Sequence, residues 1–493
     1  MLEKLIEITP KLNYDQLVDL TLYVALEAKI NDRGVWRALE QSALDNLHFF
    51  SLKQLCQLQW ASAQLKPKQM SARTSTLLTK QALEQIGTCS ALDLCYIMQG
   101  FRQKSSKDVY YKVREAMVKR KSQLFPKGVQ TEEDRNMMIN LLFTFASCRP
   151  KHHKFGQMKL YEEQDLDELV AIYEDDLCEA GEEADAEHLT RLAQAMYILK
   201  TGGYENIFWR IERRANELAS QDKLDIYHVT NILRAFSRSQ NNRMCAKDKT
   251  FYNLEKAVLR NLDSATDREL SHLMYAYGIR AVGNPELHAK FEQKLAQIAG
   301  RLDYPSMFNV IYYMLFRGIK DQAIWQQIVD NTVEQEAVLP LTYLRPFKIS
   351  EQYLKKTFPE MDLSDYRDKF WHAGFYFDQH KKEDEVFHES EYMNFKAFLT
   401  GHCLVYPELF VTQNGLFTLH FVFSEFKIAI NYHLIKFTKP EDSMPSEMQK
   451  LASKILKHDD WEIYDLSEKE FKTWDYEDRV NNIRGWLKAA KER

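Results

Sequence analysis

A repeat of paired amphipathic helices is the feature that most constrains how this chain of 493 residues can fold. Apolar residues recur every three or four positions, and the pattern restarts about every 37 to 42 residues. In one segment Leu189, Leu192 and Ala195 predict a first helix, and a second helix follows with Trp209 as an early aromatic residue. One such pair cannot bury its own apolar face, so neighbouring pairs should stack and share a core. The sequence therefore predicts a mostly α-helical fold, an α-solenoid.

The predicted pairs fall into two blocks. Small residues late in the first helices would let the partner helices approach, and the early aromatic residues, Trp209 among them, would anchor each interface. We expect one block over residues 1–173 and another over residues 188–340. The acidic stretch 174–187 between them predicts a solvated linker loop, although it could also contact a basic partner.

Composition limits the possible partners and cofactors. The 66 Lys and Arg residues face 71 Asp and Glu residues, which gives a net charge of −5 and requires any nucleic-acid surface to be local. The seven cysteines form no CxxC pair, so we expect reduced thiols without a disulfide framework or zinc site. Since no phosphate-binding or nucleotide-binding glycine motif occurs, we expect no cofactor. No window approaches about 18 apolar residues, so we expect no membrane-spanning segment.

A basic residue stands at or just after the end of nearly every predicted first helix. These positions, with their basic neighbours, are Lys29, Lys66, Arg102, Lys104, Arg149, Lys151, Lys200, Arg238, Arg243, Arg280 and Arg317. In a stacked array they would fall along one edge, where regularly spaced cations could follow the phosphates of single-stranded RNA. The alternative is structural, because cations near helix C-termini are favoured by the helix macrodipole.

The pattern changes in the C-terminal part, residues 341–493, which predicts a small α/β domain. Strand-like runs cover 404–406, 417–423 and 427–432, and Asn414-Gly415 is a hairpin turn signal between two of these regions. A helix is expected over 446–456, a short strand over 461–466 and a last helix from Tyr476.

This tail resembles the RAP domain, a small α/β module with a restriction-endonuclease-like layout. Residues 427–433 look like the first strand of the family pattern, 449–456 like its helix and 460–466 like its next strand, and Phe471 and Trp474 precede a similar last helix. The resemblance covers about 70 residues. RAP domains commonly follow helical repeats of similar period, as in octotricopeptide-like and FASTK-like proteins. The resemblance implies work on organellar RNA and a mitochondrial location, although no presequence is visible.

The tail departs from the pattern where catalysis would need acidic residues. Ile430-Asn431-Tyr432-His433 stands where the family often has Asp-Gly-Pro-His, and Glu462 lacks the Lys two residues later that a nuclease of this layout requires. We therefore expect no catalytic residues and no enzyme activity. Asn431 and His433 could contact RNA or simply end a sheet edge.

A metal site is also not expected. Asp378, His380, Asp384 and His388 are close in sequence, but they lie in a charged run that is typical of a solvated surface. The first functional hypothesis is a non-catalytic, RNA-associated protein acting in RNA processing, translation or ribosome assembly. The alternative is a scaffold subunit of a large mitochondrial complex, such as a ribosome, respiratory complex or ATP synthase, that has lost RNA binding.

Overall fold

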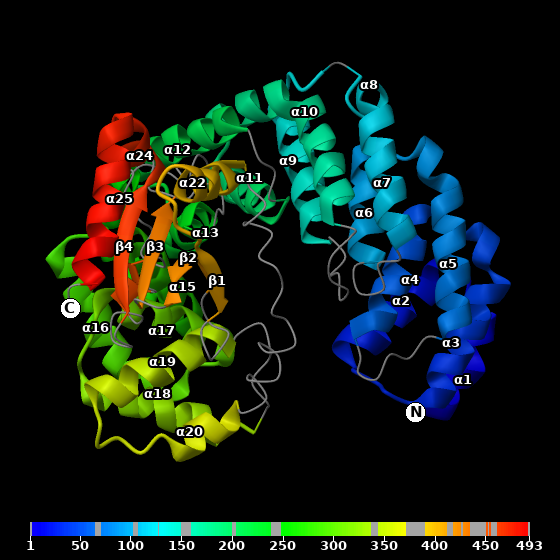
Figure 1. Cartoon of the computed structure of the whole chain (residues 1–493). Helices are drawn as coiled ribbons and strands as arrows, with labels where there is room; N and C mark the ends of the chain where they lie inside the picture. Colours follow the sequence, from blue (N-terminus) through cyan, green and yellow to red (C-terminus); the bar gives the residue numbers. More distant parts are fainter. Residues whose placement is uncertain are drawn as a thin grey trace. The chain divides into compact units, whose positions relative to one another are not determined.

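The computed structural model shows a mostly helical chain with a small β-sheet near the C-terminus (Figure 1). It describes residues 2–64, 71–101, 107–126, 128–148, 159–199, 204–237, 248–336, 344–370, 390–411, 418–424, 427–433, 450–451, 453–454 and 461–491. The chain divides into two compact units, Met1–Arg214 and Ala215–Arg493. No helix of the described residues is long and apolar enough to cross a membrane.

The described residues of the first unit form mainly helices. They are α1 (Leu2–Ile8), α2 (Tyr14–Leu22), α3 (Arg33–Asp45), α4 (Leu52–Gln64), α5 (Ala72–Gln85), α6 (Ala91–Phe101), α7 (Lys107–Lys119), α8 (Lys121–Leu124), α9 (Glu132–Ser147), α10 (Lys159–Glu183), α11 (Ala186–Leu199) and the start of α12 (Glu205–Ser220). Contacts run from α2 to α4, α4 to α6, α6 to α9 and α9 to α11, so these five helices pack in series.

Local sequence signals explain where several of these helices begin. Asn13 accepts a hydrogen bond from the N–H of Gln16 at the start of α2 in a complete capping box. The side chains of Asp32 and Ser71 each accept a backbone N–H hydrogen bond at the starts of α3 and α5. Behind the caps, apolar residues at helical spacing face the interior, and Leu17 and Leu55 are completely buried. The helical periodicity of the sequence is therefore confirmed in this unit.

The second unit begins with a further series of helices. They are α13 (Ile226–Ser237), α14 (Asp248–Asn261), α15 (Asp267–Arg280), α16 (Pro285–Ile298), α17 (Tyr304–Arg317), α18 (Gln322–Glu334), α19 (Leu344–Thr357) and α20 (Ser364–Lys369). Contacts join α13 to α15, α15 to α17 and α17 to α19, while α18 packs on α20. The pair α19 and α20 thus continues the helical packing into residues that we assigned to the α/β domain.

A four-stranded sheet lies in the C-terminal part, with helices around it (Figure 1). The elements are α22 (Ser390–Gly401), β1 (Glu408–Val411), β2 (Thr418–Phe423), β3 (Ile428–His433), β4 (Glu462–Ser467), α24 (Glu468–Thr473) and α25 (Tyr476–Lys491). The strand order is β1-β2-β3-β4, antiparallel between β1 and β2 and between β2 and β3, and parallel between β3 and β4. Part of the expected helix before β4 is described, at residues 450–451 and 453–454.

Two details of the predicted sheet differ from the structure or lie outside it. The run 404–406 is not a strand, because Leu404 has a φ of 57° and Tyr406 is 77% exposed. The first strand is β1 instead. The Asn414-Gly415 turn lies outside the described residues, and β1 and β2 on either side of it pair antiparallel as a hairpin requires.

The two faces of the sheet carry different side chains. Ile428, Ile430 and Tyr432 of β3 pack into an apolar cluster with residues of α22, α24 and α25, where the rings of Tyr432 and Phe395 stack 4.1 Å apart. Because side chains alternate along a strand, Ala429, Asn431 and His433 belong to the opposite face. Ala429 packs there with Val422 and Ile463.

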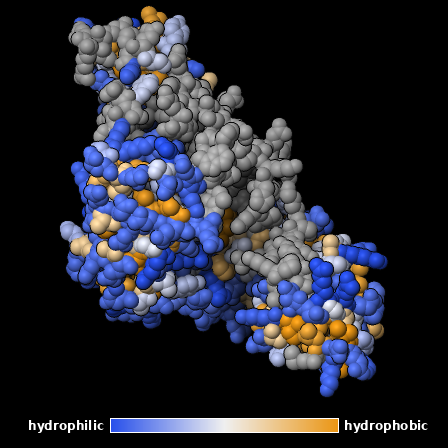
Figure 2. Space-filling view, turned by 90° about the horizontal axis from the view of Figure 1, so that it is seen from below, coloured by the Kyte–Doolittle hydropathy of each residue, from blue (hydrophilic) through white to orange (hydrophobic). Residues whose placement is uncertain are grey.

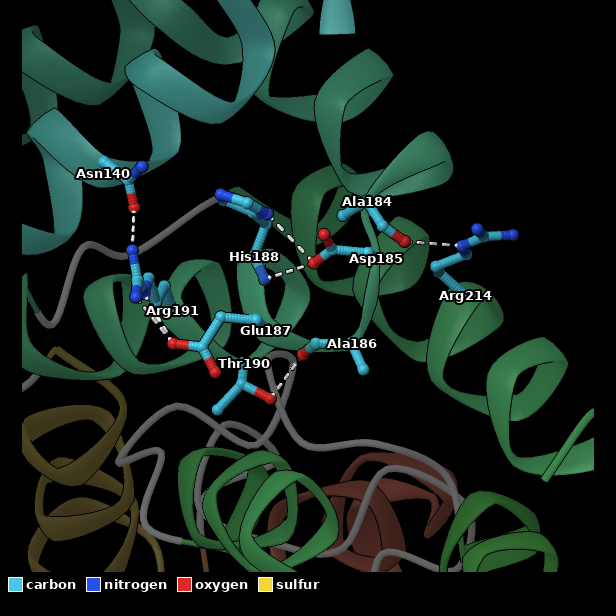
Figure 3. Close-up of polar contacts among 9 residues, drawn as sticks. All are labelled: Asn140, Ala184, Asp185, Ala186, Glu187, His188, Thr190, Arg191 and Arg214. Carbon is cyan, nitrogen blue, oxygen red and sulfur yellow. Dashed lines mark hydrogen bonds and ion pairs between the residues drawn. The ribbon is translucent and has the colours of Figure 1, made fainter. Parts of the chain in front are cut away.

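The acidic stretch predicted as a linker loop is mainly helical. Residues 174–183 form the C-terminal part of α10, where Leu177 and Ala180 are buried. The chain then turns at Ala184 and Asp185, and Figure 3 shows how this corner is held. The Asp185 carboxylate accepts a 2.8 Å hydrogen bond from the N–H of His188, and Arg214 donates to the carbonyl of Ala184 at 2.9 Å. The loop prediction failed because the acids occupy only the outer positions of an amphipathic helix.

Trp209 does not anchor a helix interface as the alignment of the repeats predicted. It is 47% exposed, whereas its neighbour Phe208 is 4% exposed. Phe208 lies three residues before the buried Ile211 and therefore on the same stripe of α12, while Trp209 is rotated out of that stripe. The predicted buried positions Ile211, Ala215 and Leu218 are confirmed, and only the aromatic anchor was misplaced, by one residue.

Apolar side chains also reach the surface near the N-terminus. Figure 2 shows apolar residues gathered among hydrophilic ones on one face of the first unit. The described residues at the start of this unit that expose large apolar side chains are Leu2, Ile6, Ile8 and Tyr14, at 38 to 42%.

Replacing Gly100 by Ala should destabilise the first unit. A Cβ at this position would lie 2.7 Å from the carbonyl oxygen of Cys56, because α4 and α6 approach closely there. We expect a loss of about 1 to 3 kcal/mol in unfolding free energy from overpacking, although Ala is the better helix former. Gly485→Ala is the matched control, since a Cβ there meets nothing within 4 Å and should stabilise α25 by about 0.5 to 1 kcal/mol. Urea unfolding followed by circular dichroism checks both, and equal stability of the two variants would contradict the expected close approach.

Candidate functional site

The structure describes only part of the predicted RNA-binding set. Lys66, Arg102, Lys104, Arg149, Lys151, Lys200, Arg238 and Arg243 lie outside the described residues, as do the metal candidates Asp378, His380, Asp384 and His388. Arg280, Arg317, Asn431 and His433 are described, and so is Lys29, which is exposed. The predicted basic edge can therefore be followed only at a few points.

Arg280 contributes to packing. It lies in the last turn of α15 as predicted, but it is only 5% exposed. Its Nη2 donates to the carboxylate of Asp248 at 2.7 Å, and its guanidinium carbon is 5.7 Å from the centre of the Phe251 ring. Both partners belong to α14, so the cation ties two neighbouring helices together and does not face a ligand.

Many other cations contact acids on neighbouring helices. Examples that join different helices or turns are Arg114–Glu168, Lys121–Asp176, Arg135–Glu183, Arg210–Glu182, Arg260–Asp222, Arg280–Asp248, Lys294–Asp263 and Arg301–Asp267. Four of the acids in these pairs, from Glu168 to Glu183, lie on α10. The acidic stretch thus contacts basic residues of its own chain.

Polar side chains meet on the face of the sheet where β3 and β4 run parallel. Asn431 of β3 is opposite Asp465 of β4, and His433 follows two residues later on the same face. Asn431 Nδ2, Ser453 Oγ and His433 Nε2 each lie 3.0 Å from Oδ1 of Asp465. We call these four residues the Asp465 cluster. Ser453 comes from the helix between the two strands, so the cluster connects three elements of the domain.

The electrostatics of the cluster centre on the Asp465 carboxylate. Burial alone would raise its pKa, but the hydrogen bond and charge of His433, with the hydrogen bonds from Ser453 and Asn431, hold the pKa below its usual range. His433 is 1% exposed, and its Nδ1 is buried with no hydrogen-bond partner among the described residues. The imidazole therefore faces the Asp465 carboxylate and is shielded from solvent.

The cluster has the chemistry of a structural hydrogen-bond network. Glu462, the acid considered in the sequence, accepts a 2.6 Å hydrogen bond from the hydroxyl of Tyr464. Glu462 precedes Asp465 by three residues on the same strand, so the two side chains lie on opposite faces of the sheet. No group of three or more His, Cys, Asp or Glu side chains that could hold a metal ion occurs among the described residues.

Asp465 and Ser453 were missed by the sequence reasoning. The family pattern has an acid in its first strand, but β3, which corresponds to that strand here, has none. The acid beside β3 is Asp465, which belongs to β4. Only the parallel register, which pairs Asn431 with Asp465, brings them together. A signal was present in the sequence, since Asp465 stands near the end of the predicted strand, but its partner could not be identified without the register.

The helix segment that contains Ser453 also reaches the helical part of the second unit. Lys454 Nζ lies 5.9 Å from the ring centre of Tyr353 in α19. A Cβ on Gly318 would lie 3.6 Å from the same Nζ atom. Gly318 follows Arg317, which is exposed at the end of α17. Two predicted candidates that are far apart in sequence, Arg317 and Asn431, are thus both close to the 453–454 segment.

Comparison with models of known protein families finds no match for this chain. Comparison with curated proteins finds none either.

Asp465→Asn should loosen the packing between β3, β4 and the 450–454 helix segment. Because the folded-state pKa of Asp465 is lowered, its charged form stabilises the fold above pH 3.8, and this contribution is lost as the pH falls through the folded pKa. We expect a local destabilisation of about 1 to 3 kcal/mol at pH 7. On acidification the variant should lose less additional stability than the native chain, because it has no Asp465 carboxylate to protonate. Hydrogen exchange of peptides covering β3 and β4 measures this.

Glu477→Gln is the control for the Asp465 variant, because Glu477 is exposed in the first turn of α25. It should change the exchange of β3 and β4 little. Unchanged protection of both strands in Asp465→Asn would contradict the structural role of the cluster.

Proposed function

We propose that this protein is a non-catalytic α-solenoid with a RAP-like tail that serves as a scaffold subunit of a large mitochondrial assembly. One observation carries the proposal: cations of the described helices are engaged by carboxylates of neighbouring helices, as in Arg280–Asp248 and Arg135–Glu183. An array neutralised in this way has little excess charge to attract a polyanion, in agreement with the net charge of −5.

The helix contacts support the solenoid part of the proposal. In both units the first helices of successive pairs pack on one another, as stacked repeats require. Arrays of this kind offer long surfaces and commonly bind other proteins. The scaffold function follows from such a surface with balanced charge.

The tail supports the absence of catalysis in the proposal. Its strand order and the helix between β3 and β4 agree with a restriction-endonuclease-like layout. Among the described residues, the acid on the face where such a nuclease would hold its metal is Asp465, and it is hydrogen-bonded to Asn431, His433 and Ser453. We propose that the domain retains the layout and uses these residues for stability.

RNA binding is the second candidate function, and one observation favours it. The exposed Arg317 and the helix segment with Lys454 come together at the end of α17, close to the Asp465 cluster. Two cations next to a polar sheet end could bind an RNA phosphate.

Native purification followed by ribonuclease treatment distinguishes the two functions. A scaffold subunit should co-migrate with the same set of proteins before and after RNA digestion. Binding of the purified chain to single-stranded RNA on filters should be weak and nearly independent of salt between 50 and 200 mM, since few counterions would be released.

Release of the chain by ribonuclease, or a steep salt dependence, would contradict the scaffold proposal in favour of RNA binding. In that case Arg317→Ala/Lys454→Ala should weaken binding to RNA and reduce the salt slope by about 2. Lys11→Ala is the matched control, because the Lys11 side chain is 68% exposed and pairs with Glu7 in the adjoining turn, in the other unit of the chain.

A further inference from the structure

An exposed tryptophan with two arginines against its ring stands out on the first unit. Trp209 on α12 is 47% exposed. The guanidinium carbon of Arg210 lies 4.8 Å from the ring centre, and that of Arg213 lies 5.8 Å from it. Each is within the range of a cation–π interaction. We call Trp209, Arg210 and Arg213 the Trp209 patch.

Packing of the helix does not explain why the largest side chain is at this position. Phe208, Ile211 and Ala215 fill the buried stripe of α12, and each is 4% exposed or less. The helix would therefore bury its apolar face equally well with a polar residue at position 209. An exposed indole is unfavourable in water unless another surface covers it.

A carboxylate on the neighbouring helix α10 holds the two arginines in place. Both guanidinium groups contact the same carboxylate oxygen of Glu182 on α10, and the distance from Arg213 Nη1 is 3.3 Å. The Arg213 side chain remains 51% exposed. Because the carboxylate and the ring restrict these long side chains before any partner arrives, little conformational entropy is left to lose on binding.

The surroundings of the patch disfavour a polyanion as the partner. Two carboxylates flank the patch on α12 itself, because Glu205 and Glu212 lie one helical turn before and one turn after Trp209. A nucleic-acid backbone would meet these negative charges together with the arginines. A protein segment can place a single carboxylate at Arg213 and apolar surface on the indole.

We propose that the Trp209 patch is a docking site for a partner protein segment that presents an apolar or aromatic side chain beside a carboxylate. Trp and Arg are the residue types that most often dominate protein–protein binding energy. The partner carboxylate would share the guanidinium groups with Glu182, and its apolar side chain would cover the free part of the indole. This inference rests on the proposed scaffold function and names the chemistry of one contact.

Binding of synthetic peptides to the full chain tests the proposal. The probes are a peptide of alternating Asp and Phe or Leu residues, the same peptide with Asn for Asp, and a single-stranded oligouridylate. Fluorescence anisotropy of labelled probes should show binding of the acidic peptide and weaker binding of the Asn peptide. Trp209→Ala should lower the affinity for the acidic peptide about tenfold. Arg213→Ala should make the affinities for the acidic peptide and the Asn peptide equal.

Trp60→Ala is the matched control, because Trp60 is 38% exposed on α4 of the same unit. It should leave peptide binding unchanged. The proposal is overturned if the acidic peptide does not bind, if Trp209→Ala and Trp60→Ala behave alike, or if oligouridylate binds in a Trp209-dependent way.

Cross-linking in the native assembly adds a readout on the true partner. A photoreactive residue in place of the exposed Asn206, one helical turn before Trp209, should cross-link to a protein segment that contains Asp or Glu next to an apolar residue. Trp209→Ala should reduce this product about tenfold, and Trp209→Phe should retain it. A cross-link to RNA, or one indifferent to Trp209, overturns the proposal. If the assembly forms but this cross-link fails, only the docking site is wrong, whereas absence of any assembly contradicts the scaffold function itself.

Discussion

Packing of each amphipathic helix against its neighbours is the constraint on which the rest of this structure depends. Such a helix exposes an apolar stripe that only a neighbouring element can cover, so each helix depends for its stability on the helices beside it. The close packing of α4 against α6, where Gly100 leaves no room for a side chain against Cys56, shows how near the first helices come. Cross-helix ion pairs such as Arg280–Asp248 then join second helices to first helices without adding net charge.

The α/β tail buries its apolar surface between a sheet and helices. Its sheet buries one face under α22, α24 and α25, and a single carboxylate on the other face connects two strands and a helix. An acid at the position of Asp465 could suggest the metal-binding site of a nuclease of this layout. The geometry instead supports a structural role, because Asn431, Ser453 and His433 of the same domain all hydrogen-bond to Asp465.

The sequence predicted most of the helices but not their finer placement. Periodicity identifies α11 and α12 because apolar spacing is a local property, yet Phe208 and Trp209 differ in exposure by one step along the helix, which spacing alone does not resolve. The acids of α10 suggested a loop because their partners, such as Arg135, are distant in sequence. Likewise the Asp465 cluster depends on strand register and on Ser453 from another element. The candidates from Lys66 to Arg243 lie outside the described residues, so the predicted basic edge as a whole stays a prediction.

The length of α10 has a mechanical consequence for the first unit. It has 25 residues, about 37 Å at 1.5 Å per residue, whereas the adjoining α9 and α11 have 16 and 14. A series of packed helices bends by adding small changes at each interface between neighbouring helices. Since α10 touches α7, α9, α11 and α12, one rigid rod crosses several of these interfaces at once. We expect this part to flex less than the N-terminal pairs, so that strain applied by a bound neighbour would be absorbed mainly between α1 and α6.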